Sequence, residues 1–218
     1  MTDAALPARP ERLRLWAECV VLFAGAPLVM ILAFEPTDLF PVLLTLTAVA
    51  AVLLHLTPGF RWRSLLEGGF LAHWRWLAGF GLFAAAGCLA LVLMLRPEGL
   101  LSLPLRLPLL WLGIMALYPI FSALPQELIY RGLFFRRYGP LFGDGRRLVV
   151  ANALAFGWGH LFYENWIAVT LSFVAGTVIG WAYWRTRSFP LAWALHAMGG
   201  MAVFTSGLGI YFYSGAVN

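Results

Sequence analysis

Seven stretches of the chain are almost wholly apolar, and short polar turns separate them. They cover about residues 15–34, 39–56, 77–95, 107–135, 148–162, 166–184 and 189–204. A transmembrane helix needs roughly 20 apolar residues, whereas strands of a membrane β-barrel are nearer ten residues long with alternating polarity. The pattern therefore predicts an all-α fold, a polytopic transmembrane helical bundle with about 7–8 spans. Residues 207–217 would form a short eighth span or a re-entrant segment.

The composition supports lipid as the solvent of this chain. Hydrophobic residues make up 61% of the sequence and charged residues 11%, against about 45–50% and about 25% in soluble domains. These values exclude a soluble cytosolic enzyme, a secreted disulfide scaffold, a disordered chain and a free nucleic-acid binder. Cys19 and Cys88 both fall inside apolar stretches and have no metal-ligand spacing, so we expect two small hydrophobic residues.

Arginine placement predicts the orientation. All fifteen basic residues are Arg, and the formal net charge is +5. With the N-terminus inside, thirteen of the fifteen lie on the inner side, and Arg96 and Arg106 remain outside. The positive-inside rule thus predicts a multi-pass cell-membrane protein with a cytoplasmic N-terminus. No A-x-A cleavage site follows the first stretch, so we expect a retained span. The Arg-only, Leu-, Ala- and Gly-rich composition is typical of a GC-rich genome, and we expect a bacterial inner membrane.

Ionisable side chains inside the apolar stretches are few, and each is a functional candidate because a charge in the membrane is costly. They are Glu18, Glu127, Arg131, His160 and His196, with His55 near a span end. Glu127 lies nine residues before Arg136, and His196 lies nine residues after Arg187, about 13–14 Å along a helix in each case. His160 lies thirteen residues after Arg147, about 20 Å. Three helices thus carry a carboxylate and two imidazoles at similar depth, which predicts an acid–base centre.

Arg131 follows Glu127 by four residues, so the two share a helix face and can form an ion pair. From spacing alone, a second interpretation stays open. In this interpretation, Glu127 and Arg131 form a purely structural ion pair, and His160 and His196 only join helices by hydrogen bonds.

Three short motifs resemble the CPBP family, which comprises type II CAAX prenyl endopeptidases and bacteriocin-processing or self-immunity proteins. The family's motifs are roughly EExxxR, FxxxH and HxxxN. Here they read Gln126–Arg131, Phe156–His160 and His196–Gly200. The resemblance covers about residues 119–200, and we see no linker or internal repeat. We therefore expect a single membrane-embedded domain, residues 1–218, with its motif-bearing core at about 119–200.

Two positions depart from the family pattern. Gln126 stands where the family has its first glutamate, and Gly200 stands where the third motif has Asn. Three interpretations of Gln126 are open: Glu127 takes the role of base, the glutamine is an inactivating substitution, or the protein is a non-catalytic relative. Asn152, on the helix face of Phe156, is a candidate for the lost side-chain donor.

The resemblance implies an intramembrane endopeptidase of the glutamic type. In this hypothesis Glu127, with His160, deprotonates a water that attacks a peptide carbonyl. His196 stabilises the oxyanion, Arg131 orients Glu127, and Gln126 supports the site.

Several alternatives accompany this hypothesis. No cofactor is expected, and zinc held by the two His and the Glu is the alternative. A catalytically inactive relative, acting as an immunity or peptide-binding membrane protein, is the main rival to the enzyme, and a transporter is disfavoured because no internal repeat is present. The expected partners are a membrane-embedded or membrane-associated protein substrate and the lipid bilayer, without nucleic acid. The sequence predicts no oligomeric state.

Overall fold

The structure, a computed structural model, describes residues 9–35, 38–143 and 145–212, and every regular element in these ranges is a helix. The predicted all-α fold is confirmed. The proposed eighth span at 207–217 is described only in part. There, a short 3₁₀ turn, η10 (Leu208–Tyr211), follows the last long helix, and residues 213–218 lie outside the described ranges.

The helices begin and end close to the limits of the apolar stretches. The first stretch is one continuous helix built from α1, η1 and α2, and the fourth is one continuous helix from α6 to η8. The bounds are α1 Arg9–Val20, η1 Val21–Gly25, α2 Ala26–Ala33, α3 Leu39–His55, η3 Trp62–Leu65, η4 Phe70–His73, α4 Trp74–Leu95, η5 Pro97–Gly99, α5 Ser102–Arg106, α6 Pro108–Tyr118, η6 Pro119–Ala123, α7 Leu124–Glu127, η7 Leu128–Tyr138, η8 Gly139–Leu141, α8 Gly145–Gly159, η9 His160–Tyr163, α9 Trp166–Thr186 and α10 Phe189–Ser206.

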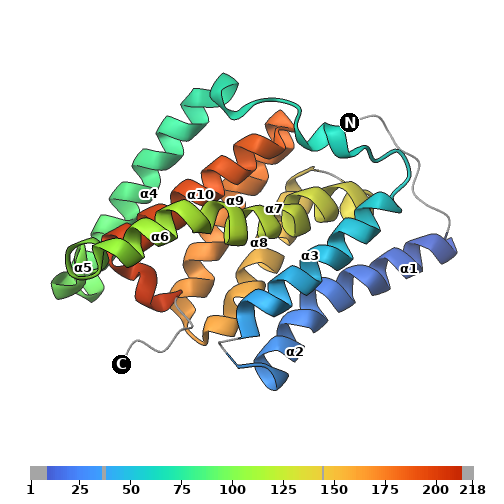
Figure 1. The fold of residues 1–218 in the computed structure, drawn as a ribbon. Coiled ribbons are helices and arrows are strands. Elements are labelled where there is room, and N and C mark those ends of the chain that lie inside the picture. The colour runs from blue at the N-terminus through green and yellow to red at the C-terminus, as the bar shows by residue number, and fades with distance from the viewer. Residues whose placement is uncertain (1–8, 36–37, 144, 213–218) are drawn as a thin grey trace.

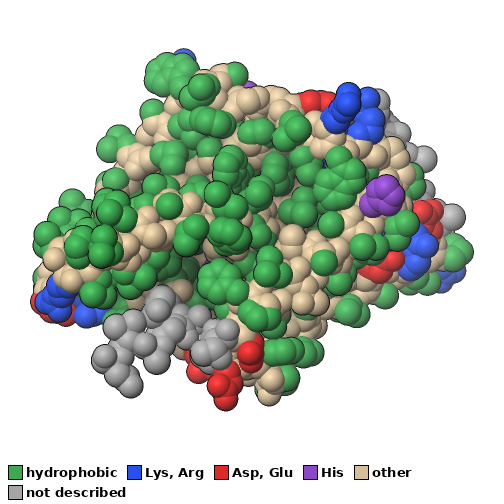
Figure 2. All heavy atoms as spheres, viewed as in Figure 1, with side chains coloured by type: hydrophobic (Ala, Val, Ile, Leu, Met, Phe, Trp, Pro, Cys, Tyr) green, Lys and Arg blue, Asp and Glu red, His purple; other side chains and the backbone are tan. Residues whose placement is uncertain are grey.

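Four of the described helices are long and apolar enough to cross a membrane: Arg9–Ala33, Phe70–Leu95, Pro108–Leu141 and Trp166–Thr186. α3 is apolar but shorter, and α8 and α10 complete the bundle. Large apolar side chains are exposed on its outside, and Figure 2 shows them covering the middle of the visible face while charged groups gather toward its edges. A surface of this kind is stable in lipid and not in water, so the protein is a membrane protein.

The long helix from α6 to η8 crosses the front of the view in Figure 1; its α6 part has no buried residue, whereas its η7 part lies in the core. α4 packs along α10, α9 packs along α8 and α10, and α3 packs along η7. The helix from α6 to η8 contains Pro119 and Pro125, yet it stays continuous through two π-helical segments, η6 and η7. Pro119 and Pro125 lack a backbone N–H, and the wider π turns adjust the local hydrogen bonding around them.

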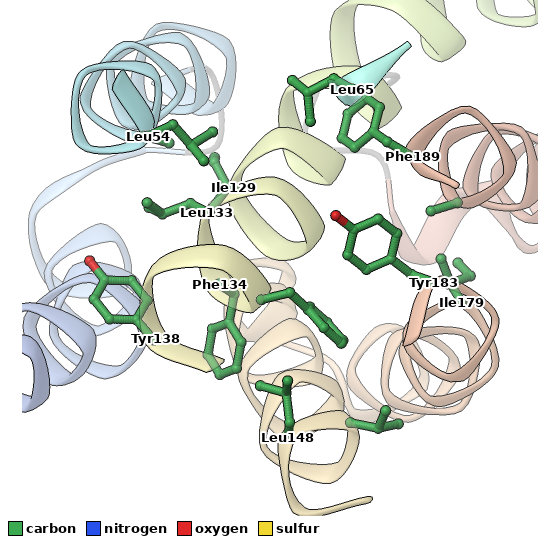
Figure 3. Close-up of a cluster of buried hydrophobic side chains, with 14 of the residues drawn as sticks. Leu54, Leu65, Ile129, Leu133, Phe134, Tyr138, Leu148, Ile179, Tyr183 and Phe189 are labelled. Carbon is green, nitrogen blue, oxygen red and sulfur yellow. The ribbon is translucent and has the colours of Figure 1, made fainter. Parts of the chain in front are cut away.

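The main core lies between η7 and its neighbours (Figure 3). Leu133 and Phe134 of η7 are almost fully buried, as are Leu54 of α3 and Tyr183 of α9. η7 contacts α1, α3 and α8, and eight of its eleven residues are buried, so packing on several sides holds it in place. The core therefore fixes the segment that carries the first motif.

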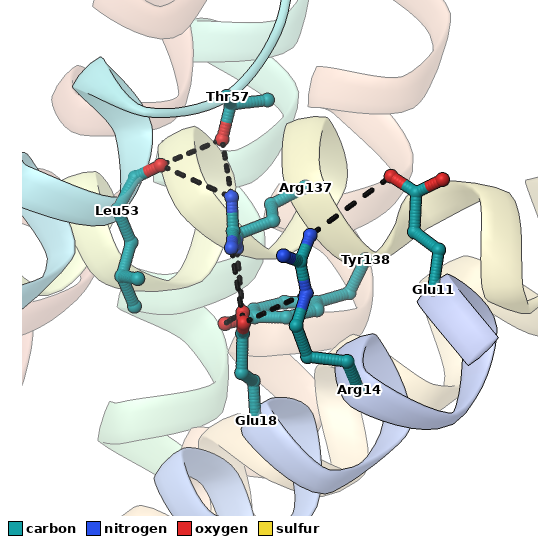
Figure 4. A network of polar contacts seen from close by, with 7 residues as sticks. All are labelled: Glu11, Arg14, Glu18, Leu53, Thr57, Arg137 and Tyr138. Carbon is teal, nitrogen blue, oxygen red and sulfur yellow. Dashed lines mark hydrogen bonds and ion pairs between the residues drawn. The ribbon is translucent and has the colours of Figure 1, made fainter. Parts of the chain in front are cut away.

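A polar network joins α1 and the end of α3 to the C-terminal end of η7 (Figure 4). Arg137 binds Glu18 through two contacts, Nε to Oε2 at 2.7 Å and Nη2 to Oε1 at 3.1 Å, and its Nη1 lies 3.3 Å from Thr57 Oγ1. Arg14 approaches Glu18 as well, at 3.6 Å. The intramembrane candidate Glu18 is thus the carboxylate of a structural ion pair, and the bidentate geometry explains its place inside the first span.

Candidate active site

Glu127 is the last residue of α7 and is fully buried. Its Oε1 lies 2.9 Å from Nη1 of Arg131 and 2.8 Å from Nδ1 of His196. Among the described residues, none forms a hydrogen bond with Oε2. One carboxylate oxygen therefore joins the first motif to the third, across 69 residues of sequence.

Arg131 is also fully buried, and helices on two sides hold its guanidinium. Nη2 donates to the carbonyl of Gly176 on α9 at 3.3 Å, and the carbon Cζ lies 4.7 Å above the ring of Phe156 on α8. The contact to Glu127 is an ion pair without good hydrogen-bond alignment, since Nη1 has no aligned acceptor. The predicted pair is present, and it compensates two charges that would otherwise be costly inside a membrane.

The two histidines are oriented by groups that only accept hydrogen bonds. His160, the first residue of η9 directly after α8, has Nδ1 2.7 Å from the carbonyl of Phe156. His196 on α10 has Nδ1 2.8 Å from Oε1 of Glu127. Each Nδ1 therefore donates, which leaves a lone pair on each Nε2. Phe156 packs edge-to-face against both rings, with centroids 4.7 Å from His160 and 5.3 Å from His196. The structure thus brings both predicted imidazoles around one phenylalanine with their basic nitrogens available.

A cavity of about 840 Å³ opens beside these rings. Its lining is mostly apolar and includes His160, His196, Gln126, Tyr118 and Tyr163. A second, smaller cavity of about 70 Å³ also reaches Gln126 and His160. The larger volume is that of a site for a small molecule or a peptide segment, and the polar groups cluster in one part of an apolar wall.

Gln126 and Glu127 face different surroundings, as neighbours on a helix must. Gln126 lines the cavity and donates from Nε2 to Ser122 Oγ at 3.0 Å. Glu127 is not among the residues that line the described cavities. The sequence hypothesis placed the Glu127 carboxylate on the attacking water. In the structure this carboxylate contacts His196, and His196 is the one of the two that lines the cavity.

Asn152 is fully buried on α8 and does not line either cavity. Its Nδ2 donates to the backbone carbonyl of Tyr130 in η7 at 2.7 Å. Asn152 precedes His160 by two helical turns, about 12 Å, so it shares the helix face but lies at another depth. In the structure, the Asn152 amide joins α8 to η7, and its role as a replacement for the third motif's asparagine stays a prediction.

Sequence reasoning missed Tyr118, which lines the cavity and packs against the His196 ring with centroids 6.1 Å apart. Gly200 was the one available signal, because a glycine in place of a polar side chain leaves room for another residue to approach.

Within residues 9–35, 38–143 and 145–212, no group of three or more His, Cys, Asp or Glu side chains is arranged to hold a metal ion.

The comparison with protein families gives one match. The family described as Type II CAAX prenyl endopeptidase Rce1-like matches residues 108–201, from the start of α6 into α10. The matched segment contains all three motifs, which confirms the resemblance drawn from them. No curated protein and no solved structure matches the chain.

Proposed function

We propose that the chain is an intramembrane endopeptidase, because residues 108–201 match the family described as Type II CAAX prenyl endopeptidase Rce1-like. One observation carries the proposal. His196 lines the cavity, and its imidazole is hydrogen-bonded to the fully buried carboxylate of Glu127. A base oriented by a carboxylate is the arrangement that hydrolases use to activate a nucleophile.

In the proposed reaction, Nε2 of His196 takes a proton from a water molecule in the cavity. The water oxygen bonds to the carbonyl carbon of the substrate, and the π electrons of the C=O bond move to its oxygen. The C–N bond then breaks as the carbonyl re-forms, and the imidazolium returns its proton to the departing nitrogen. The products are a carboxylic acid and an amine, and His196 is neutral again.

Glu127 acts through His196 in this scheme, as a positioning residue. It holds the Nδ1–H tautomer and stabilises the imidazolium that forms, at an Nδ1 to Oε1 distance of 2.8 Å. Arg131 contacts the same carboxylate oxygen at 2.9 Å and helps to hold it in place. His160, with its own Nε2 available, accepts a hydrogen bond from the attacking water. This division of roles assigns the base to His196, which lines the cavity, in place of the buried Glu127.

The substrate class follows from the cavity. Its wall is predominantly apolar and its volume is about 840 Å³, which suits a membrane-embedded or membrane-associated protein or peptide. The chemistry that we propose uses only side chains and needs no cofactor.

A paired cleavage assay tests the proposal. The purified protein in liposomes is offered membrane-anchored peptides, and His196→Ala and His160→Ala are compared with the wild type. We expect kcat to fall about 10²- to 10⁴-fold in both variants. Glu127→Gln should lower kcat with little change in KM, since the substrate does not touch it. His55→Ala is the matched control, because His55 is exposed at the end of α3. Full cleavage by all three site variants would falsify the assignment.

We propose the bacterial inner membrane as the location, with the N-terminus in the cytoplasm, because thirteen of the fifteen arginines then lie inside. Arg61→Cys, in the exposed segment between α3 and α4, provides a probe. An impermeant maleimide should label this cysteine in inverted vesicles and not in intact cells. Labelling in intact cells would reverse the orientation.

Gln126 favours a second candidate, a non-catalytic relative that binds a peptide in the same cavity. Gln126 lines the cavity at the position where the family has its first glutamate, and an amide cannot act as a base. Gln126→Glu separates the two candidates. If the wild type cleaves, the peptidase stands; if only Gln126→Glu cleaves, the natural protein is the non-catalytic relative.

A further inference from the structure

Gly200 leaves a space that the side chain of Tyr118 fills. Gly200 lies on α10 one turn after His196, and a Cβ at this position would overlap the ring and hydroxyl of Tyr118. The Tyr118 side chain therefore occupies the space that a side chain at position 200 would need, so only glycine fits there with Tyr118 in its present place.

Neighbours on α10 hold the Tyr118 ring in that place. The ring packs edge-to-face against His196, with centroids 6.1 Å apart, and against Phe204, at 5.6 Å. His196, Gly200 and Phe204 are spaced by four residues, so they form one face of the helix. Tyr118 itself ends α6, directly before Pro119. A residue from α6 thus lies in the groove between two aromatic side chains of α10.

The hydroxyl of Tyr118 is available to a ligand. Tyr118 lines the large cavity together with His196, and none of the described residues forms a hydrogen bond with its hydroxyl. Partly buried tyrosines normally find a partner for this group. A donor without a protein partner beside the proposed base is suited to an oxygen atom of the substrate.

We propose that Tyr118 is a catalytic residue and that its hydroxyl donates a hydrogen bond to the carbonyl oxygen of the cleaved bond. The inference rests on the proposed peptidase function. As the water proton moves to His196 Nε2, the carbonyl oxygen gains the negative charge and Tyr118 stabilises it, keeping its own proton. The family's third motif would supply an amide donor from residue 200, and here a hydroxyl from α6 occupies the same space. Electrostatic stabilisation of this kind is worth about 10²- to 10³-fold in kcat for one donor.

Tyr118→Phe tests the proposal, since it removes only the hydroxyl. We expect kcat to fall about 10²- to 10³-fold, with KM changed by less than about threefold because the ring still lines the cavity. Tyr211→Phe is the matched control: Tyr211 packs against the small cluster around Val92 and Leu208 and does not line the cavity. It should keep the wild-type kcat.

A second pair of variants tests the exchange of donors. Tyr118→Ala removes the ring and opens the space beside residue 200, and the double variant with Gly200→Asn places an amide there. We expect the double variant to recover at least tenfold in kcat over Tyr118→Ala.

The outcomes separate this inference from the proposed function. If His196→Ala abolishes cleavage while Tyr118→Phe keeps the wild-type kcat, or changes KM alone, the role of Tyr118 is overturned and the peptidase remains. If the wild type cleaves no membrane-anchored peptide, the proposed function and the role of Tyr118 are both overturned.

Discussion

Replacement of Arg131 by methionine probes the buried charge pair on which the site depends. Arg131→Met keeps a long, flexible side chain but removes the guanidinium, which contacts Glu127 at 2.9 Å and the Gly176 carbonyl at 3.3 Å. It also removes the cation that lies 4.7 Å above the Phe156 ring. Among the residues that the structure describes, His196 would then be the one remaining polar partner of the buried Glu127.

The magnitude follows from the burial of both partners. Both side chains are fully inaccessible, and removal of one member of a buried pair costs about 3–5 kcal/mol because the other charge is left uncompensated. The double variant Glu127→Gln, Arg131→Met carries neither charge, and its amide oxygen can still accept from His196. We therefore expect the double variant to cost less than Arg131→Met alone, with a coupling energy of about 2 kcal/mol or more.

Unfolding in lipid bilayers or bicelles measures these free energies, for example by trapping of the unfolded state. The matched control is Arg14→Met, because Arg14 is 62% exposed and contacts Glu11 at 3.9 Å. Its loss should cost less than about 1 kcal/mol. A cost for Arg131→Met no larger than that of the control, or additive costs in the double variant, would refute the reasoning.

Three further predictions concern packing and chemistry. Asn152→Ala removes the hydrogen bond to the Tyr130 carbonyl and should lower the unfolding free energy by about 1–3 kcal/mol, while kcat per folded molecule stays within about twofold. A large loss of kcat at unchanged stability would contradict this structural role. Gly176→Val places a branched side chain where even a Cβ would lie 2.9 Å from Phe156 Cδ1, so the unfolding free energy should fall by about 1–3 kcal/mol. Gly79→Val is the control, because nothing lies within 4 Å of a Cβ there, and an equal fall in this variant would contradict the packing argument. A metal chelator should leave the cleavage rate unchanged, and elemental analysis of the purified protein should show no bound metal. Activity that is lost on chelation and regained with zinc would support the zinc-dependent alternative.

The helices could be predicted from the sequence because lipid leaves few choices. A long apolar stretch in hydrocarbon must satisfy its backbone groups internally, so it forms a helix. The apolar stretch 39–56 accordingly became α3, Leu39–His55, and the stretch 189–204 became α10, Phe189–Ser206. Continuity through Pro119 and Pro125 was not predictable, because it depends on π turns that form within the packed bundle.

The members of the site could be proposed from their similar depth on three helices, but a direct contact was predictable only between residues that share a helix. The pair Glu127–Arg131 follows from the spacing of four residues. The contact between Glu127 and His196 joins residues 69 positions apart. Only the packing of α10 against the long helix from α6 to η8 brings them together.

By itself, the sequence determined the all-α membrane bundle, the likeness to the family and the buried ion pair, since each follows from composition or from the period of one helix. Only the tertiary structure decided which of Gln126 and Glu127 faces the cavity, and that Tyr118 fills the space beside Gly200. Consecutive residues on a helix point about 100° apart, and the rotation of the helix in the bundle, set by packing on all its sides, selects which one meets the substrate.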